Sequence, residues 1–142
     1  VLMVPVLVLT HGELATALLT AARSIDPHLD EGSQALALPW DVDSVRATEL
    51  VKEAIDQQRT GDGLVVLTDM FGGTATNVTL PFMKPDEVEV VTGVNLPMLV
   101  KLGSLRRQKI GPKEMADRLR DAGQKSIRVA SNFLRRPGEG EA

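Results

Sequence analysis

Short apolar runs rich in β-branched residues alternate with stretches of helical periodicity along this chain. We predict five strands, at residues 4–9, 34–38, 64–68, 88–91 and 127–130. The first, third and fourth of these runs are almost continuously apolar, which is typical of strands that are covered on both faces. Strand–helix–strand alternation at this spacing requires right-handed crossovers between parallel strands. The pattern therefore predicts a doubly wound α/β fold with a mainly parallel sheet.

The last predicted strand differs from the other four. Ile127 and Val129 alternate with Arg128, a pattern typical of an edge strand. Such a strand can pair with its own sheet or with the sheet of a partner. We expect a single domain over residues 1–134. Residues 135–142 are rich in glycine, proline and charge and are predicted to form a disordered tail.

Helix boundaries are indicated by residues that favour particular turns. Thr10 and Glu13 have the spacing of a capping box at the start of the first helix. Asn95 is a candidate N-cap for the fourth helix, with Pro97 in its first turn. Because Pro81 falls within the third helical segment, that helix is predicted to be short or kinked.

Composition excludes several classes of function. The chain has no cysteine, which excludes disulfides, thiolate catalysis, iron–sulfur clusters and cysteine zinc sites. A net charge of −3 argues against a dedicated nucleic-acid-binding protein. The apolar run at residues 1–9 is too short to span a bilayer and has no basic residues before it, so we expect a cytoplasmic protein without membrane insertion.

Chemistry in such a fold is expected beyond the carboxyl ends of the strands, at the point where the strand order reverses. The residues that follow the predicted strands and can contribute to a site are Thr10, His11, Gly12, Trp40, Asp69, Gly72, Gly73, Thr74 and Asn95. The sequence does not decide whether Trp40 covers the sheet edge or contacts a partner.

His11 is the strongest candidate for a reactive group. It follows a buried strand and precedes a helix, so its ring is expected near unsatisfied backbone N–H groups and the positive end of the helix dipole. This setting suits an anion carried on the imidazole, such as a phosphoryl group. Asp69 on a neighbouring strand can accept a hydrogen bond from one ring nitrogen, which would fix the tautomer and leave the other nitrogen as nucleophile. Thr74 offers a hydroxyl and helix N–H groups for phosphoryl oxygens.

Other motifs favour simpler interpretations. The Gly72-Gly73 loop lacks both the Walker pattern and the dinucleotide-binding fingerprint. His28 lies among acidic residues, a pattern that favours a charged surface loop over a metal site. A basic cluster is predicted to be a solvated helix end or a surface that attracts an acidic partner; it consists of Arg106, Arg107, Lys109 and Lys113.

Three blocks of sequence, in this order and spacing, resemble the IIA component of mannose-type sugar phosphotransferase systems. They are VLTHG at residues 8–12, LTDMFGGTATN at residues 67–77 and VVTGVNLPML at residues 90–99. The resemblance extends over essentially the whole domain, from residue 4 to about residue 133. It identifies residues 1–134 as a mannose-type IIA domain.

The resemblance implies a phosphotransferase component that uses neither metal nor nucleotide cofactor. His11 would accept a phosphoryl group on Nε2 from the phosphocarrier HPr and pass it to a IIB protein, while Asp69 holds Nδ1. The phosphoryl group would lie among Thr10, Gly12, Gly72, Gly73 and Thr74. The resemblance also implies a homodimer in which the strand at residues 127–130 is exchanged between subunits.

The sequence departs from the family at one point of the site and contains no IIB segment, so the acceptor is expected to be a separate protein. The family usually has Gly-Gly-Ser-Pro where this chain has Gly72-Gly73-Thr74-Ala75. Threonine keeps the hydroxyl but restricts χ1, and the loss of proline restores an N–H donor.

Two alternatives stay open. The chain could be a regulatory module that is phosphorylated on His11 and read by another protein, without a sugar permease. A flavodoxin-like cofactor binder is disfavoured, because only Trp40 is available to flank a flavin ring.

Overall fold

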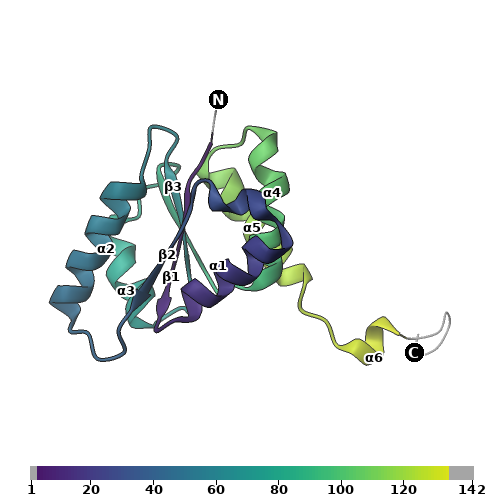
Figure 1. The fold of residues 1–142 in the computed structure, drawn as a ribbon, viewed down its shortest axis with the longest axis horizontal. Coiled ribbons are helices and arrows are strands. Elements are labelled where there is room, and N and C mark those ends of the chain that lie inside the picture. The colour runs from purple at the N-terminus through teal and green to yellow at the C-terminus, as the bar shows by residue number, and fades with distance from the viewer. Residues whose placement is uncertain (1–2, 135–142) are drawn as a thin grey trace.

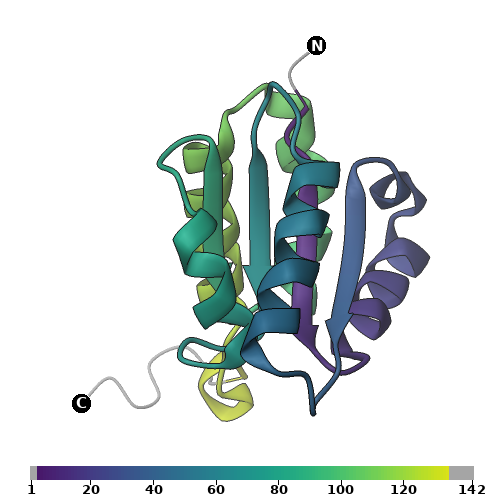
Figure 2. The same cartoon turned by 90° about the vertical axis from the view of Figure 1, so that its left-hand side faces the viewer.

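The computed structural model describes residues 3–134, which fold around a four-stranded sheet with the order β2-β1-β3-β4. Every neighbouring pair of strands is parallel, and Figure 2 shows the strands side by side. The strands are β1 (Val6–His11), β2 (Ser33–Leu38), β3 (Leu64–Thr68) and β4 (Val88–Thr92). The predicted doubly wound α/β fold is confirmed.

Helices cover both faces of the sheet (Figure 1). One face carries α1 (Leu14–Ile25), α4 (Leu96–Leu105) and α5 (Pro112–Lys125). The other face carries α2 (Ser44–Gln58) and α3 (Thr74–Thr79). Short 3-10 turns span Pro27–Asp30, Leu80–Phe82 and Arg106–Gln108, and a final single turn of helix, α6, spans Ala130–Phe133.

The two faces of β1 supply two separate apolar cores. Val6 and Val8 pack with α1, α4 and α5, whereas Leu7 and Leu9 pack toward α2 and α3. All four side chains are fully buried. A strand buried on both faces must be apolar at every position, which explains the continuous run in the sequence.

The predicted helix boundaries are confirmed in two cases and wrong in one. The Asn95 side chain accepts a hydrogen bond from Met98 N–H at 3.0 Å and caps α4. Near Pro81, α3 ends after Thr79 and gives way to a 3-10 turn. The capping box does not form: Glu13 is the N-cap of α1, and the buried Thr10 hydroxyl accepts from Ala15 N–H at 2.7 Å, two residues beyond the N–H that a capping box would use.

The strand predicted at residues 127–130 is wrong for this single chain. Residues 127–129 form no strand and Ala130 begins α6, which lies apart from the sheet (Figure 1). Residues 127–129 make no strand pairing with the four-stranded sheet of their own chain. Its large apolar side chains are 63–78% exposed; they are Ile127, Val129, Phe133 and Leu134.

The disordered tail predicted at residues 135–142 lies outside the described residues. None of the helices found over residues 3–134 has the length and apolar character needed to cross a membrane. The cytoplasmic location stays a prediction.

The prediction that Arg106 is part of a solvated basic cluster is wrong. Its guanidinium donates to the backbone carbonyls of Glu31 and Gly32 at 2.7 and 2.6 Å, and to the Ser33 hydroxyl at 3.0 Å. Burial lowers the pKa of Arg106 to about 10, and the Coulombic attraction of Glu31 opposes that change. Arg106 therefore holds the loop that leads into β2. This loop lies at the amino ends of the strands, opposite the carboxyl ends where the site is expected.

We expect Arg106→Met to lower the free energy of unfolding by about 2 kcal/mol, because the substitution removes charge-assisted bonds and leaves backbone carbonyls without their donors. Urea denaturation followed by circular dichroism measures the change. The neighbouring Arg107 is exposed, so Arg107→Met is the matched control and should shift stability by less than about 0.5 kcal/mol. Equal effects of the two substitutions would contradict a structural role specific to Arg106.

Candidate functional site

The site lies where the strand order reverses, between β1 and β3. These strands are neighbours in the sheet, with Leu9 paired to Thr68 at their carboxyl ends. The chain leaves β1 toward α1 on one face, and after β3 it enters α3 on the other face. Diverging connections open a crevice at this point. His11 is the last residue of β1, and Asp69 directly follows β3.

The structure brings His11 and Asp69 into direct contact. His11 Nδ1 lies 2.7 Å from Asp69 Oδ2, and the backbone N–H of His11 donates to the same oxygen at 3.0 Å. Both side chains are only 12% exposed. The other carboxylate oxygen of Asp69 accepts from Met70 N–H at 2.9 Å. Two backbone donors thus hold the carboxylate in place independently of its contact with the imidazole.

These contacts determine which ring nitrogen is free to react. Burial would raise the pKa of Asp69, but hydrogen bonds from the backbone and ring of His11, the His11 charge and the Met70 bond together lower it. An ionised carboxylate can only accept a hydrogen bond, so Nδ1 of His11 must carry the proton. In the neutral ring, Nε2 then keeps its lone pair and is the nucleophilic nitrogen.

The loop after Asp69 is held by buried hydroxyls. Thr76 Oγ1 donates to the Met70 carbonyl at 2.7 Å and lies 2.7 Å from Thr68 Oγ1. Asn77 Nδ2 donates to the Gly72 carbonyl at 3.2 Å. Gly72 has φ of +83°, a left-handed conformation that favours glycine. Thr76 was not among the predicted site residues, because the threonine that directly follows the Gly-Gly pair in the sequence is Thr74.

Gly73 borders the imidazole of His11, and Thr74 follows it in the chain. A Cβ atom on Gly73 would lie 2.8 Å from Cε1 of His11 and 3.6 Å from Nε2, so the ring packs against the bare backbone of this glycine. Gly73 is the N-cap of α3, and the exposed Thr74 is its first residue. Over residues 3–134, the Thr74 hydroxyl makes no hydrogen bond within the protein.

Thr10 and Gly12 lie on either side of His11 but have different surroundings. Thr10 is fully buried, and its hydroxyl bonds to Ala15 N–H inside the protein. Gly12 has φ of +56°, and a Cβ there would lie 2.6 Å from Nε1 of Trp40. The Trp40 indole stacks on the His11 imidazole, with ring centroids 5.0 Å apart and planes inclined by 20°. Neither this stacking nor the close approach to Gly12 was predicted.

Large apolar side chains are exposed at this edge of the sheet. Trp40, Met70 and Phe71 are 80%, 57% and 77% exposed. Trp40 touches the His11 ring, and Met70 and Phe71 continue directly from Asp69. We call these three residues the apolar rim of the site.

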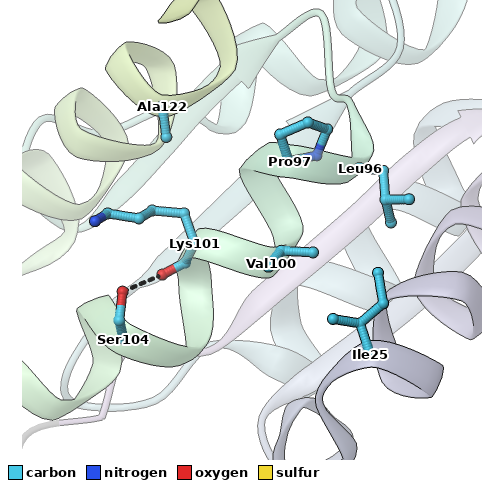
Figure 3. Close-up of a pocket in the computed structure, with 7 residues that line it drawn as sticks. All are labelled: Ile25, Leu96, Pro97, Val100, Lys101, Ser104 and Ala122. Carbon is cyan, nitrogen blue, oxygen red and sulfur yellow. Dashed lines mark hydrogen bonds between the residues drawn. The ribbon is translucent and has the colours of Figure 1, made fainter. Parts of the chain in front are cut away.

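Other candidate regions hold less chemistry. Near His28, the Asp26 carboxylate accepts the His28 backbone N–H at 3.1 Å. Within the described part of the chain, no cluster of histidine and acidic side chains could hold a metal ion. An open apolar groove between α1, α4 and α5 shares no residue with the site (Figure 3). It is lined by Ile25, Leu96, Pro97, Val100, Lys101, Ser104 and Ala122.

We expect the stability contributed by Asp69 to depend on pH. Its pKa in the folded protein is lower than the ordinary value of 3.8, so the ionised carboxylate stabilises the folded state above pH 3.8. This contribution is lost as the pH falls through the folded-state pKa. Asp69→Asn should therefore be less stable than wild type at pH 7, and the difference should narrow below pH 3.8, as measured by urea unfolding at pH 7 and pH 3.

Asp41 provides the control for this measurement. It is exposed and makes no hydrogen bond among the described residues, so Asp41→Asn should change the free energy of unfolding by less than about 0.5 kcal/mol at pH 7. A difference between wild type and Asp69→Asn that is the same at both pH values would contradict the stabilising role of the ionised carboxylate.

Known proteins that are similar to this chain include IIA components of phosphotransferase systems. The chain is 28% identical over 135 residues to the fructose-specific EIIA component of Bacillus subtilis (strain 168), a match that covers 93% of this chain and 90% of that protein. The IIA protein associated with the fucose utilization operon of Streptococcus pneumoniae is 29% identical, with a TM-score of 0.77 and coverage of 92% and 96%. The EIIA component from Streptococcus agalactiae has the same fold, with 24% identity, a TM-score of 0.76 and coverage of 92% and 99%.

A family model covers most of the chain and includes the site. The model for EIIA-man, described as the PTS system fructose IIA component, matches residues 5–119. This range contains His11, Asp69 and the Gly72-Gly73-Thr74 segment. The chain belongs to the mannose-type IIA family of sugar phosphotransferase system components.

Proposed function

We propose that His11 is a phosphoryl relay, which accepts a phosphoryl group from phosphorylated HPr and passes it to a separate IIB protein. The observation that carries this proposal is the 2.7 Å contact between His11 Nδ1 and an ionised Asp69. This contact leaves Nε2 with its lone pair at the carboxyl edge of the sheet. Membership of the IIA family supports the role in sugar phosphotransfer.

The relay consists of two displacements at phosphorus. In the first, the Nε2 lone pair of His11 forms a bond to phosphorus, and the bond between phosphorus and the donor's phosphorylated group breaks. The proton on Nδ1 stays in place, held by Asp69, so the phosphorylated ring carries a positive charge beside that carboxylate. In the second, the nucleophile of the acceptor bonds to phosphorus while the Nε2–P bond breaks, which returns His11 to its starting state.

Gly73 and Thr74 are suited to contact the transferred group. The ring edge containing Nε2 lies against Gly73, and Thr74 follows with an exposed hydroxyl that has no partner within residues 3–134. We infer that this hydroxyl donates to a phosphoryl oxygen. Gly72 and Gly12 allow the backbone turns on either side of the site, because both have positive φ. Thr10 has an indirect role, since its buried hydroxyl fixes the start of α1.

The apolar rim supports donors and acceptors that are proteins. A small anionic substrate would gain nothing from exposed Trp40, Met70 and Phe71, whereas grouped apolar side chains are typical of a surface that binds another protein. HPr and the IIB protein must each bring a reactive side chain to Nε2 of His11. We therefore infer that both dock over this rim.

The relay can be tested through the mass of the intact protein. After incubation with phosphoenolpyruvate, enzyme I and HPr from the same organism, we expect an acid-labile gain of one phosphoryl group. His11→Ala should lose the gain while keeping its circular dichroism spectrum, and His28→Ala should retain it. The absence of a gain in the folded wild-type protein, or its presence in His11→Ala, would contradict the proposal.

Addition of a mannose-type IIB protein from the same organism separates transport from regulation. In a relay, the phosphoryl group should leave the phosphorylated protein for IIB within the mixing time of a transfer assay. If it stays on His11 until it is hydrolysed, the function as a relay is wrong and the chain is a regulatory phosphohistidine module.

We also propose that the protein is a homodimer that exchanges its C-terminal segment. Among the described residues, β3 is the one strand beside β4, and apart from a bridge between Val88 and Lys84 the outer edge of β4 carries no partner strand. A groove of mixed character lies beside this edge, with Val90 and Ala116 among its apolar lining residues and Lys113 and Arg120 among its charged ones. The exposed Ile127 and Val129 have the alternation that such an edge would accept. One interaction would then cover both the apolar segment of one subunit and the open edge of its partner.

Light scattering coupled to size-exclusion chromatography tests the exchange. We expect the wild-type protein to have the mass of a dimer, and the double variant Ile127→Asp/Val129→Asp to have the mass of a monomer, because the substitutions replace the two apolar side chains that the exchange would bury with carboxylates. Ser131→Asp, in the same exposed segment, should leave the dimer intact. A monomeric wild type at micromolar concentration would contradict the exchange.

A further inference from the structure

Trp40 is unusually exposed for a side chain with a defined ring contact. It is 80% exposed, so the indole contributes little to the stability of the fold through burial of its own surface. Its indole nevertheless lies nearly parallel to the His11 imidazole at a centroid distance of 5.0 Å. Such stacked geometry between two rings is favourable beyond simple contact area.

The backbone around Trp40 places the indole over His11. His11 and Leu38 are register partners in β1 and β2, and the N–H of Gly12 donates to the Leu38 carbonyl at 2.7 Å. The chain then turns, with Val42 N–H donating to the Pro39 carbonyl at 3.2 Å. Trp40 is the first residue inside this turn. Gly12 supplies the space, because a Cβ there would lie 2.6 Å from the indole Nε1.

The stacking restrains a motion that the other contacts of the imidazole leave free. Asp69 holds Nδ1 in the ring plane but does not prevent the ring from tilting about the Nδ1–Oδ2 line. Trp40 blocks that tilt from one ring face, and the bare backbone of Gly73 borders the edge at Cε1. The three contacts come from two loops, because Asp69 and Gly73 lie in the loop after β3 and Trp40 lies in the loop after β2. Together they fix the direction of the Nε2 lone pair.

We propose that Trp40 is a positioning residue for phosphoryl transfer, whose indole face holds the His11 imidazole and stabilises the positively charged ring of the phosphorylated state. This inference rests on the proposed relay function of His11. The charge on the ring arises because Nε2 gives its lone pair to phosphorus while Nδ1 keeps its proton. An indole face is the aromatic surface that most favours a cation stacked on it.

A small phosphoryl donor distinguishes positioning from docking. Phosphoramidate delivers a phosphoryl group to histidine without a protein surface, so its reaction does not require a partner protein to dock on the apolar rim. We expect Trp40→Ala to react with phosphoramidate roughly 5- to 20-fold more slowly than wild type, and Trp40→Phe to recover most of the rate. A slower reaction with phospho-HPr together with an unchanged rate with phosphoramidate would overturn the proposal and leave Trp40 as a docking residue.

Val45→Ala is the matched control, because Val45 is an exposed apolar residue in the first turn of α2, outside the site. It should react with phosphoramidate at the wild-type rate. An equal loss of rate in Val45→Ala and Trp40→Ala would show a general effect of truncating this connection and would overturn the specific role of Trp40.

The NMR spectrum of the unphosphorylated protein gives a readout that does not depend on phosphotransfer. The carbon-bound ring protons of His11 should be shifted upfield by the indole ring current, and this shift should vanish in Trp40→Ala and persist in Trp40→Phe. An unshifted His11 ring in wild type would overturn the stacking itself. If the shift is present but neither donor phosphorylates His11, the relay function fails and the positioning role for transfer fails with it.

Discussion

The hydrogen bond between His11 and Asp69 is the contact on which the rest of the site depends. It joins the ends of β1 and β3, two strands that are neighbours in space and separated by 58 residues in the sequence. Because the ionised carboxylate can only accept, this bond sets the tautomer, and the tautomer decides that Nε2 is the reactive nitrogen. The carboxylate does so from a fixed position, since the backbone N–H groups of His11 and Met70 hold both of its oxygens.

Much of the fold and of the central pair could be predicted from the sequence because both follow from topology. Continuous apolar runs indicate strands covered on both faces, and parallel strands bring their carboxyl ends to one edge. His11 and Asp69 are the polar residues that follow two such strands, and the sheet order makes those strands neighbours. No knowledge of side-chain packing is needed to expect that they meet.

The features that were missed depend on information that periodicity does not contain. Trp40 stacks on His11 because of the turn after β2 and the space above Gly12, and neither is visible as a pattern of apolar residues. Arg106 was expected in solvent, but its bonds to the loop before β2 depend on how α4 ends against that loop. The alternation at Ile127 and Val129 indicates an apolar face that is expected to be buried, but it cannot indicate which chain buries it.

The departure at Thr74-Ala75 can be understood from the hydroxyl contacts of the neighbouring loop. A proline in the first turn of α3 would restrict the backbone there in advance. In this chain Ala75 is fully buried in the core beneath α2, and Thr76 bonds to both the Met70 carbonyl and Thr68. Those contacts attach the start of α3 to the end of β3 from inside the protein. The loop that borders the imidazole is therefore held by side-chain bonds, and Thr74 remains exposed, with a hydroxyl that makes no hydrogen bond within residues 3–134. This leaves the hydroxyl free for the phosphoryl contact that we propose.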